Sequence, residues 1–304
     1  MPDSGAVAFL GLGRMGAPMA ARLVAAGRRV VAYDPADAAR ARAAASGCEL
    51  AATALDALAG AGVVVTMLPD ERAVAALAYD DGLVARWRPG VLWIEMTSSL
   101  PSVTRAVAAD VVAAGGAFVD APVSGGVGGA EAGSLTVMAA GAAAALTQAR
   151  PILEPLAARI VHVGARPGAG DAVKSLNNML SAVNLTAATE ALAIALREGI
   201  DPRVLVDAVS TSTGGSHAVA TKLGAFVLDG RETGFTIDQY LKDLRIALTI
   251  ASESGYAPAL AGRTRDTWRA LAEADGGGRD HVDVVRLLLA QIGLELPGSD
   301  PGQA

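Results

Sequence analysis

Short runs of apolar residues alternate with longer alanine-rich segments through the first half of the chain. The runs expected to form strands are residues 7–10, 29–33, 63–68, 91–96, 117–119, 135–139 and 160–163. Between the early runs, residues 18–26 and 36–45 repeat their apolar positions at helical spacing. Apolar strands that alternate with helices predict a mainly parallel sheet with both faces covered, which is the doubly wound α/β arrangement.

The pattern changes after about residue 163. Residues 164–170 are rich in Gly and Pro and predict a loop, and a long helix is expected at 171–198, ended by Gly199 and Pro202. Further helices are expected at 202–210, 216–228, 236–254 and 282–292, with no strand after residue 165. We therefore predict a doubly wound domain over 1–164 and an all-helical domain over 165–304, joined by the long helix.

Three glycines follow the first predicted strand directly and open a helix. Gly11 permits a tight turn, Gly13 lets a pyrophosphate approach the backbone, and Gly16 allows close packing of helix against sheet. The N–H groups at the helix start attract phosphate. A glycine-rich turn without a ligand is the alternative, but the strand before and the helix after it favour a dinucleotide site. That site comprises Gly11, Leu12, Gly13, Arg14, Met15 and Gly16.

A carboxylate ends the second predicted strand. Asp34 lies 23 residues after Gly11, where it can accept hydrogen bonds from both ribose hydroxyls and would repel a 2′-phosphate. We therefore expect NAD as the cofactor. NADP stays open, because Arg40 and Arg42 follow further along the chain and could contact a phosphate.

Composition excludes several other classes of protein. Hydrophobic residues make up 52% of the 304 residues, enough for a large core, and a net charge of -6 without a basic run argues against nucleic-acid binding. One cysteine and three histidines give no disulfide and no metal-ligand spacing, which favours a reducing cytoplasm. The apolar stretch at 176–196 carries Asn and Glu, so we interpret it as a buried helix and expect no membrane association.

Three later segments carry polar groups suited to an acid substrate. Ser124, Gly125 and Gly126 follow a predicted strand, in a loop that can turn backbone N–H groups and a hydroxyl toward an anion. Lys174 and Asn178 are four residues apart on the long helix and so share one face. A second lysine, Lys242, stands beside Asp243 on a later helix.

Together with the glycine turn, these segments resemble the β-hydroxyacid dehydrogenase family, of the 3-hydroxyisobutyrate dehydrogenase and 2-hydroxy-3-oxopropionate reductase type. The resemblance covers about residues 6–292. It implies a Rossmann-type N-terminal domain, a long interdomain helix and an all-helical C-terminal domain used in dimer contacts. The implied activity is hydride transfer between NAD(P) and a small β-hydroxyacid or its semialdehyde.

The resemblance also implies a role for each matching residue. Lys174 would be the general acid and base, and Asn178 would orient its amine. The Ser124–Gly125–Gly126 segment would hold the substrate carboxylate. Lys242 would reach both cofactor and substrate, and the cofactor would further contact Met67, Leu68 and Ser98. A lysine that acts as a base near neutral pH needs its pKa lowered by burial or by a neighbouring cation.

Other interpretations stay open at this point. Lys174 alone would suit a solvated helix surface. An imine reductase shares the architecture but usually lacks this lysine, and a non-catalytic NAD(P)-binding sensor would turn over no acid. The sequence does not identify the hydroxyacid, its enantiomer or the physiological direction. It favours an unphosphorylated acid, since no basic patch is evident, and a homodimer or homotetramer.

Overall fold

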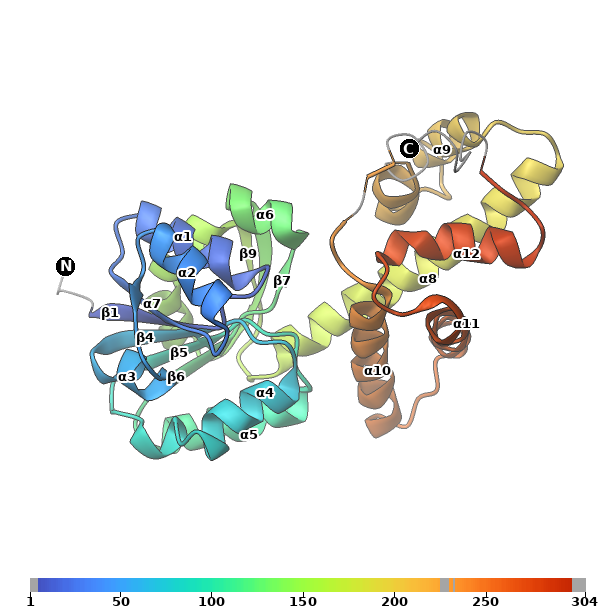
Figure 1. The fold of residues 1–304 in the computed structure, drawn as a ribbon. Helices are drawn as coiled ribbons and strands as arrows, with labels where there is room; N and C mark the ends of the chain where they lie inside the picture. The colour runs from blue at the N-terminus through green and yellow to red at the C-terminus, as the bar shows by residue number, and fades with distance from the viewer. Residues whose placement is uncertain (1–4, 225–229, 232, 297–304) are drawn as a thin grey trace. The chain divides into compact units, whose positions relative to one another are not determined.

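The computed structural model describes residues 5–224, 230–231 and 233–296, and its chain forms two compact units, Met1–Lys174 and Ser175–Ala304 (Figure 1). The first unit is built on one sheet in the order β3-β2-β1-β4-β5-β6-β8-β7, with β9 paired to β8. Its strands are β1 Ala6–Leu10, β2 Val30–Tyr33, β3 Glu49–Leu50, β4 Ala61–Thr66, β5 Leu92–Glu95, β6 Ala117–Asp120, β7 Val123–Ser124, β8 Leu135–Ala140 and β9 Ala157–Gly164.

Neighbouring strands are parallel along the run β3-β2-β1-β4-β5-β6, as predicted for a doubly wound sheet. Strand β8 runs antiparallel to β6 and β7, and β9 pairs with it in parallel. Among parallel strands the carboxyl ends share one edge of the sheet. The segments that follow β1, β4, β5 and β6 therefore meet at the same edge.

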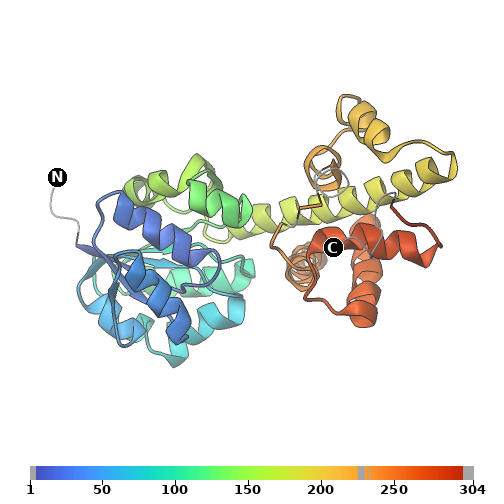
Figure 2. The same ribbon diagram turned by 45° about the horizontal axis from the view of Figure 1, so that its top comes forward.

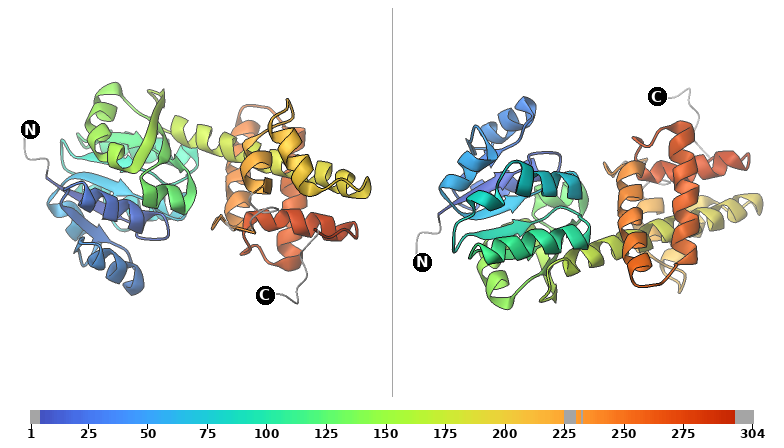
Figure 3. Two further views of the ribbon diagram at one scale, coloured as in Figure 1. Left: turned by 90° about the horizontal axis from the view of Figure 1, so that it is seen from above. Right: turned by 90° about the horizontal axis from the view of Figure 1, so that it is seen from below.

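Both faces of this sheet are covered by helices, which Figures 1 and 3 show as two layers. Val7 and Phe9 of β1 belong to one apolar core, and Ala8 and Leu10 belong to the other, as the two-residue period of a strand requires. The first core is closed by α1 (Gly16–Ala25), α2 (Asp37–Ala45), α6 (Gly126–Ala132) and α7 (Ala143–Leu153), and the second by α3 (Ala54–Ala59), α4 (Glu71–Ala75), η1 (Ala76–Asp80) and α5 (Pro101–Ala113). Short 3-10 turns η2 (Val84–Arg86) and η3 (Glu154–Leu156) complete the unit.

The regular elements of the second unit that the structure describes are all helices or helical turns. Helix α8, Ala169–Arg197, starts in the first unit and is the long helix in Figure 2. Leu185 and Leu192 of α8 pack with Trp268 in the core of the second unit. The other elements are α9 (Pro202–Ser210), the π-helical turn η4 (Ala218–Leu223), α10 (Ile237–Glu253), α11 (Ala259–Asp275), the 3-10 turn η6 (His281–Asp283) and α12 (Val284–Gln291).

Several sequence predictions need correction. Helix α11 was not expected, and neither were the two-residue strands β3 and β7. Ser124 therefore ends a strand, paired with Thr136 of β8, rather than lying in a loop. Strand β4 ends at Thr66, which places Met67 and Leu68 in the following turn. Of the helix expected at 216–228, η4 covers the middle, and residues 225–228 lie outside the described part of the chain.

The absence of strands after residue 165 is confirmed for the described residues, apart from one isolated bridge between Thr236 and Asp280. Helix α8 is long and apolar enough to cross a membrane by length and composition. Ala182, Leu185 and Leu192 are nevertheless fully buried in the core of the second unit. It is the core helix of a soluble protein.

Candidate functional site

The glycine turn after β1 is a tight, backbone-lined cradle. Gly11 has a φ of +95°, and a Cβ on it would overlap the Met67 carbonyl, so the position requires glycine. A Cβ on Gly16 would overlap the Gly11 carbonyl oxygen, while a Cβ on Gly13 would meet nothing within 4 Å. Helix α1 begins at Gly16 without a side-chain cap, so its first N–H groups suit an external acceptor. These features fit the pyrophosphate of a dinucleotide.

Asp34 follows the end of β2 and is bonded to this turn. Its Oδ2 accepts the N–H of Leu12 at 2.7 Å, and its Oδ1 accepts the N–H of Ala36 at 2.8 Å. Arg40 donates to the Asp34 backbone oxygen at 2.6 Å and pairs with Asp37. The carboxylate is half-buried beside the glycine turn, where a ribose would lie in a dinucleotide-binding fold.

The turns after β4 and β5 are tied to each other. The Leu68 N–H donates to Thr97 Oγ1 at 2.9 Å, and the Thr97 N–H donates to Glu95 Oε1 at 2.7 Å. Met67 continues the β1 pairing, because its N–H donates to the Leu10 carbonyl at 3.0 Å. The predicted cofactor contacts Met67, Leu68 and Ser98 therefore share the sheet edge at which the glycine turn lies, and all three are half-buried.

The Ser124–Gly125–Gly126 segment turns from β7 into α6. Gly125 and Gly126 have φ values of +133° and +64°, and both are exposed. Gly126 is the first residue of α6, and Gly125 offers no side chain to cap it. The segment thus presents a hydroxyl and helix-start N–H groups, the donors that a carboxylate ligand needs.

The start of α8 is fastened to the ends of β5 and β6 by two buried carboxylates. Asp120 Oδ2, at the end of β6, accepts the N–H groups of Gly170 at 2.9 Å and Asp171 at 3.3 Å. Asp171 in turn accepts the N–H of Ser99 at 3.0 Å and the hydroxyl of Thr104 at 2.6 Å. Lys174 follows within one turn of α8 and is only 9% exposed. The lysine is therefore held at the carboxyl edge of the sheet.

Burial perturbs the acids of this cluster. Glu95, Asp120 and Asp171 are all fully buried. Burial raises the pKa of Glu95 to about 8 and that of Asp120 to about 6. Burial, together with the charges of Glu95 and Asp120, raises the pKa of Asp171 well above its ordinary value. The sequence did not predict these roles, although Asp120 stands directly after a predicted strand, Asp171 begins the predicted long helix and Glu95 lies within a predicted apolar strand.

In the second unit, the predicted site residues Asn178 of α8 and Lys242 of α10 both contact the Asp243 side chain. Asn178 Nδ2 donates to Asp243 Oδ2 in a short hydrogen bond, and Asn178 Oδ1 accepts from Asn177. Lys242 Nζ lies 3.5 Å from Asp243 Oδ1, and the Asp243 side chain is 1% exposed. Lys242 and Asp243 are thus part of a packed polar cluster with Asn178 rather than a solvated pair. The contacts of these residues with substrate stay a prediction.

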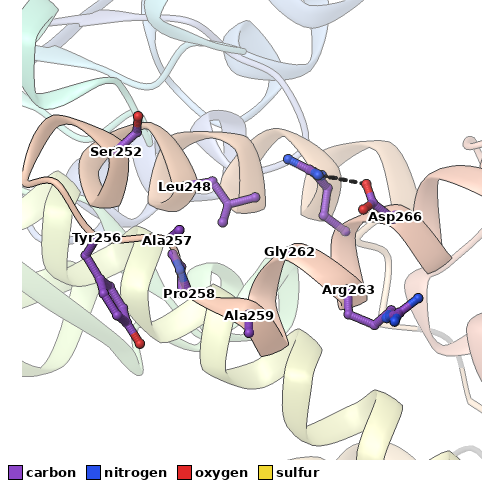
Figure 4. Close-up of a pocket in the computed structure, with 10 residues that line it drawn as sticks. Leu248, Ser252, Tyr256, Ala257, Pro258, Ala259, Gly262, Arg263 and Asp266 are labelled. Atoms are coloured by element: carbon purple, nitrogen blue, oxygen red, sulfur yellow. Dashed lines mark hydrogen bonds and ion pairs between the residues drawn. The ribbon is translucent and has the colours of Figure 1, made fainter.

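A separate hollow of about 450 Å³ lies where α10 turns into α11 (Figure 4). Arg265 donates to Asp266 at 2.9 Å beside it, and Arg263 also lines it. None of the residues predicted from the sequence lines this hollow, and Asp266 is the one carboxylate among its lining residues. The candidate residues lie instead at the sheet edge of the first unit and, separately, in the Asn178–Asp243 cluster of the second.

Comparison with known proteins identifies the family. Residues 6–164 match the model for the NAD-binding domain of 6-phosphogluconate dehydrogenase, and residues 168–288 match the model described as NAD-binding of NADP-dependent 3-hydroxyisobutyrate dehydrogenase. The 3-hydroxyisobutyrate dehydrogenase of Pseudomonas aeruginosa is 38% identical over 92% of this chain and 97% of its own length. The 2-(hydroxymethyl)glutarate dehydrogenase of Eubacterium barkeri is 34% identical over 98% of this chain and 99% of its own.

Solved structures agree with the sequence comparison. The Mycobacterium tuberculosis 3-hydroxyisobutyrate dehydrogenase with L-serine matches at a TM-score of 0.87 and 38% identity, over 93% of this chain and 99% of that one. Fold, cofactor turn and relatives agree along nearly the whole chain. The chain therefore belongs to the β-hydroxyacid dehydrogenase family of NAD(P)-dependent oxidoreductases.

Proposed function

We propose that this protein oxidises the hydroxyl group of a small 3-hydroxyacid to the semialdehyde, and reduces the semialdehyde in reverse, with Lys174 as general acid and base. The observation that carries the proposal is the placement of Lys174. It is buried within one turn of the Asp120–Asp171 attachment, at the sheet edge that also carries the glycine turn. Open α/β sheets bind their ligands at this edge.

The chemistry divides between cofactor and chain. The nicotinamide ring of the bound cofactor supplies the hydride acceptor in oxidation and the hydride donor in reduction. In oxidation, neutral Lys174 Nζ takes the hydroxyl proton while the carbon bearing that hydroxyl gives up its hydride. In reduction, the Lys174 ammonium returns a proton to the carbonyl oxygen. In each direction one proton moves between the substrate oxygen and Lys174, and one hydride moves between the substrate carbon and the cofactor.

The remaining residues bind and orient. Ser124, Gly125 and Gly126 hold the substrate carboxylate through the hydroxyl and helix-start N–H groups. Asn178, fixed by Asp243, orients the lysine amine from the next turn of α8. Lys242 contacts cofactor and substrate. Holding the reactants in one geometry supplies several kcal/mol of the barrier reduction.

NAD is the proposed cofactor. The Asp34 carboxylate beside the glycine turn suits ribose hydroxyls and repels a 2′-phosphate. Arg40, which could otherwise contact that phosphate, is engaged by the Asp34 backbone oxygen and by Asp37. Glycine-turn contacts from Leu12, Arg14 and Met15 complete the proposed cofactor site.

We further propose a cytoplasmic homodimer or homotetramer. Large apolar side chains of the helical unit are exposed by 56% or more, which is unfavourable in water unless another copy covers them. They are Leu180, Ile194, Val204 and Leu260. Light scattering of the purified protein tests the oligomer, and a monomer at micromolar concentration would contradict it.

Nicotinamide absorbance tests the function. The protein is given NAD or NADP with a panel of 3-hydroxyacids, both enantiomers of each, and Lys174→Ala is compared with Arg197→Ala on the last, exposed turn of the same helix. Lys174→Ala should lower kcat by roughly 100-fold or more, the contribution of a general base, while NADH binding by fluorescence persists. Full activity, or loss of NADH binding, would contradict the role.

The same panel separates the alternatives. Reduction of a cyclic imine without turnover of any hydroxyacid would identify an imine reductase. Tight cofactor binding with no turnover of either substrate class would identify a sensor. Either result would overturn the proposed function.

A further inference from the structure

The turn after β5 is bonded to two fully buried acids of the first unit. The Thr97 N–H donates to Glu95 Oε1 at 2.7 Å, and the Ser99 N–H donates to Asp171 Oδ1 at 3.0 Å. Ser98, a predicted cofactor contact, lies between these two amides and is half-buried. The backbone on both sides of Ser98 is therefore fixed by carboxyl groups, and the charge of each group acts on this turn.

The order of the strands indicates that the nicotinamide half of the cofactor lies at this turn. The sheet runs β2-β1-β4-β5 through its parallel part. Asp34 after β2 suits the adenosine ribose, and the glycine turn after β1 suits the pyrophosphate. A dinucleotide that continues in the same direction along this edge brings its nicotinamide to the turns after β4 and β5. These turns carry Leu68 and Ser98, and the Leu68 N–H donates to Thr97 Oγ1 at 2.9 Å.

Glu95 differs from the other two acids of the cluster in its position. Asp120 and Asp171 lie at the start of α8, where helix N–H groups favour negative charge, and Asp120 Oδ2 accepts two of these groups. Glu95 ends a strand instead. Its Oε1 accepts from Thr97 and, at 3.4 Å, from the Thr66 hydroxyl, while its Oε2 has no hydrogen-bond partner among the described residues. A buried carboxylate oxygen without a donor is costly, so Glu95 is the acid of the cluster best suited to carry a proton.

The groups around Glu95 favour its neutral form. Burial raises the pKa of Glu95 to about 8, and the charge of Asp120 on the neighbouring β6 adds to this shift. Asp171 on α8 belongs to the same cluster, and its pKa is raised in part by the charge of Glu95. The neighbour on β4 is the neutral Thr66. Lys174, three residues after Asp171, adds an ionisable amine at the same edge, so its titration must be separated from that of Glu95.

The two redox forms of NAD differ by one charge at the nicotinamide. The ring is a cation in NAD⁺ and neutral in NADH, and the rest of the molecule is the same. A buried charge acts more strongly than a charge in water, because the protein interior screens it less. An ionised Glu95 therefore favours NAD⁺, whereas a neutral Glu95 does not distinguish the two forms by charge.

We propose that Glu95 links the redox state of the bound cofactor to one proton, because its carboxyl group stays neutral with NADH and releases its proton when NAD⁺ binds. The inference rests on the proposed cofactor site and concerns binding rather than hydride transfer. The O–H bond of the carboxyl group breaks, the proton passes to the solvent, and the negative charge left on Glu95 offsets the positive charge of the ring. Glu95 is thus a positioning residue that also sets the preference between the two cofactor forms.

Proton release during cofactor binding tests the proposal. Calorimetric titration of the Lys174→Ala protein at pH 8, in buffers of different ionisation enthalpy, counts the protons released without interference from the lysine. If NAD⁺ lowers the pKa of Glu95 by about one unit, about 0.4 proton is released at pH 8. The Kd for NAD⁺ should then fall about fivefold between pH 7 and pH 9. NADH should release no proton and should keep its affinity over the same range.

Two variants in the same Lys174→Ala background assign the proton. Glu95→Gln keeps the size of the side chain and cannot titrate, so its binding of NAD⁺ should release no proton and should not depend on pH. Glu131→Gln makes the same chemical change at an exposed position near the end of α6, and it should keep the release of the parent protein.

The outcomes separate this proposal from the proposed function. An equal pH dependence of NAD⁺ and NADH binding, or proton release that persists in Glu95→Gln, overturns the role of Glu95 and leaves the proposed function standing. A protein that binds neither cofactor form overturns both. If Glu95→Gln does not fold, infrared difference spectra of the Lys174→Ala protein decide. The band of a protonated buried carboxyl group should disappear with NAD⁺ and remain with NADH, and a band that NAD⁺ leaves unchanged refutes the proposal.

Discussion

Asp171 is the residue whose removal tests most directly how α8 is attached to the sheet. The carboxyl is fully buried and accepts from the Ser99 N–H and the Thr104 hydroxyl. In Asp171→Ala both donors lose their partner inside the protein. A buried donor without a partner costs about 1–3 kcal/mol, so the two together cost about 2–6 kcal/mol.

We expect a loss of stability in the lower part of that range, because the folded protein disfavours the ionised form of this carboxyl group. Burial and the charges of Glu95 and Asp120 raise the pKa of Asp171, so its removal also relieves repulsion. We expect Asp171→Ala to lower the free energy of unfolding by about 2–4 kcal/mol. Asp171→Asn keeps the size, offers an oxygen to the Ser99 N–H and an amide N–H to Thr104 Oγ, and carries no charge. It should stay within about 1 kcal/mol of wild type.

Urea unfolding of the full chain is followed by tryptophan fluorescence in a Trp268→Phe background, which leaves Trp87 and Trp93 to report on the first unit. The two rings stack at 5.2 Å between centroids inside its core. Asp207→Ala, on the exposed surface of α9, is the control and should change stability by less than about 0.5 kcal/mol. Equal losses for Asp171→Ala and Asp171→Asn, or no loss for Asp171→Ala, would refute the reasoning.

Two further predictions concern Glu95 and the glycine turn. The pKa of Glu95 is raised from 4.5 to about 8, mainly by burial, so the stability that this group contributes is complete below about pH 4.5 and is lost as the pH rises through 8. The free energy of unfolding of Glu95→Gln should therefore fall less between pH 5 and pH 9 than that of wild type, as measured by urea unfolding at each pH. An equal fall in both proteins would contradict this assignment. In the glycine turn, Gly16→Ala forces a Cβ onto the Gly11 carbonyl and should lower both Tm and NADH affinity. Gly13→Ala meets nothing within 4 Å and should weaken NADH binding, by fluorescence titration, at an unchanged Tm; equal drops in Tm for the two variants would count against a ligand-facing Gly13.

Two sequence features predicted most of the fold: the spacing of apolar residues, and the Gly and Pro residues that end helices and strands. Continuous apolar strands predicted the parallel sheet. The glycine turn and Asp34 predicted a cofactor site at the sheet edge, and in the structure the Leu12 N–H donates a hydrogen bond to Asp34. Strands β3 and β7 could not be predicted, because two residues carry no period. Their strand geometry depends on the neighbours that pair with them.

The sequence of helix α11 does contain a helical pattern of apolar residues, but the pattern is weak. Ala261, Thr264, Trp268 and Leu271 are buried at helical spacing, but Gly262 and a series of charged residues interrupt the apolar pattern. The carboxylate attachment of α8 was beyond the sequence for a different reason. Asp120 and Asp171 are 51 residues apart, and only the closing of the sheet brings β6 to the start of the helix. The hydrogen bonds of Lys222 to Ser181 and Tyr240 depend in the same way on three separate elements, η4, α8 and α10.

The placement of the lysines has a practical consequence for handling the protein. Lys174 is buried, and Lys222 and Lys242 are half-buried, so none of the three lysines of the chain is fully exposed. Acylating reagents that normally decorate a protein surface meet arginine there, whose guanidinium they do not modify. With Lys174 in its proposed role as general acid and base, the rate of its acylation would measure access to the reaction centre, and coupling to a solid support through this ε-amine would inactivate the enzyme.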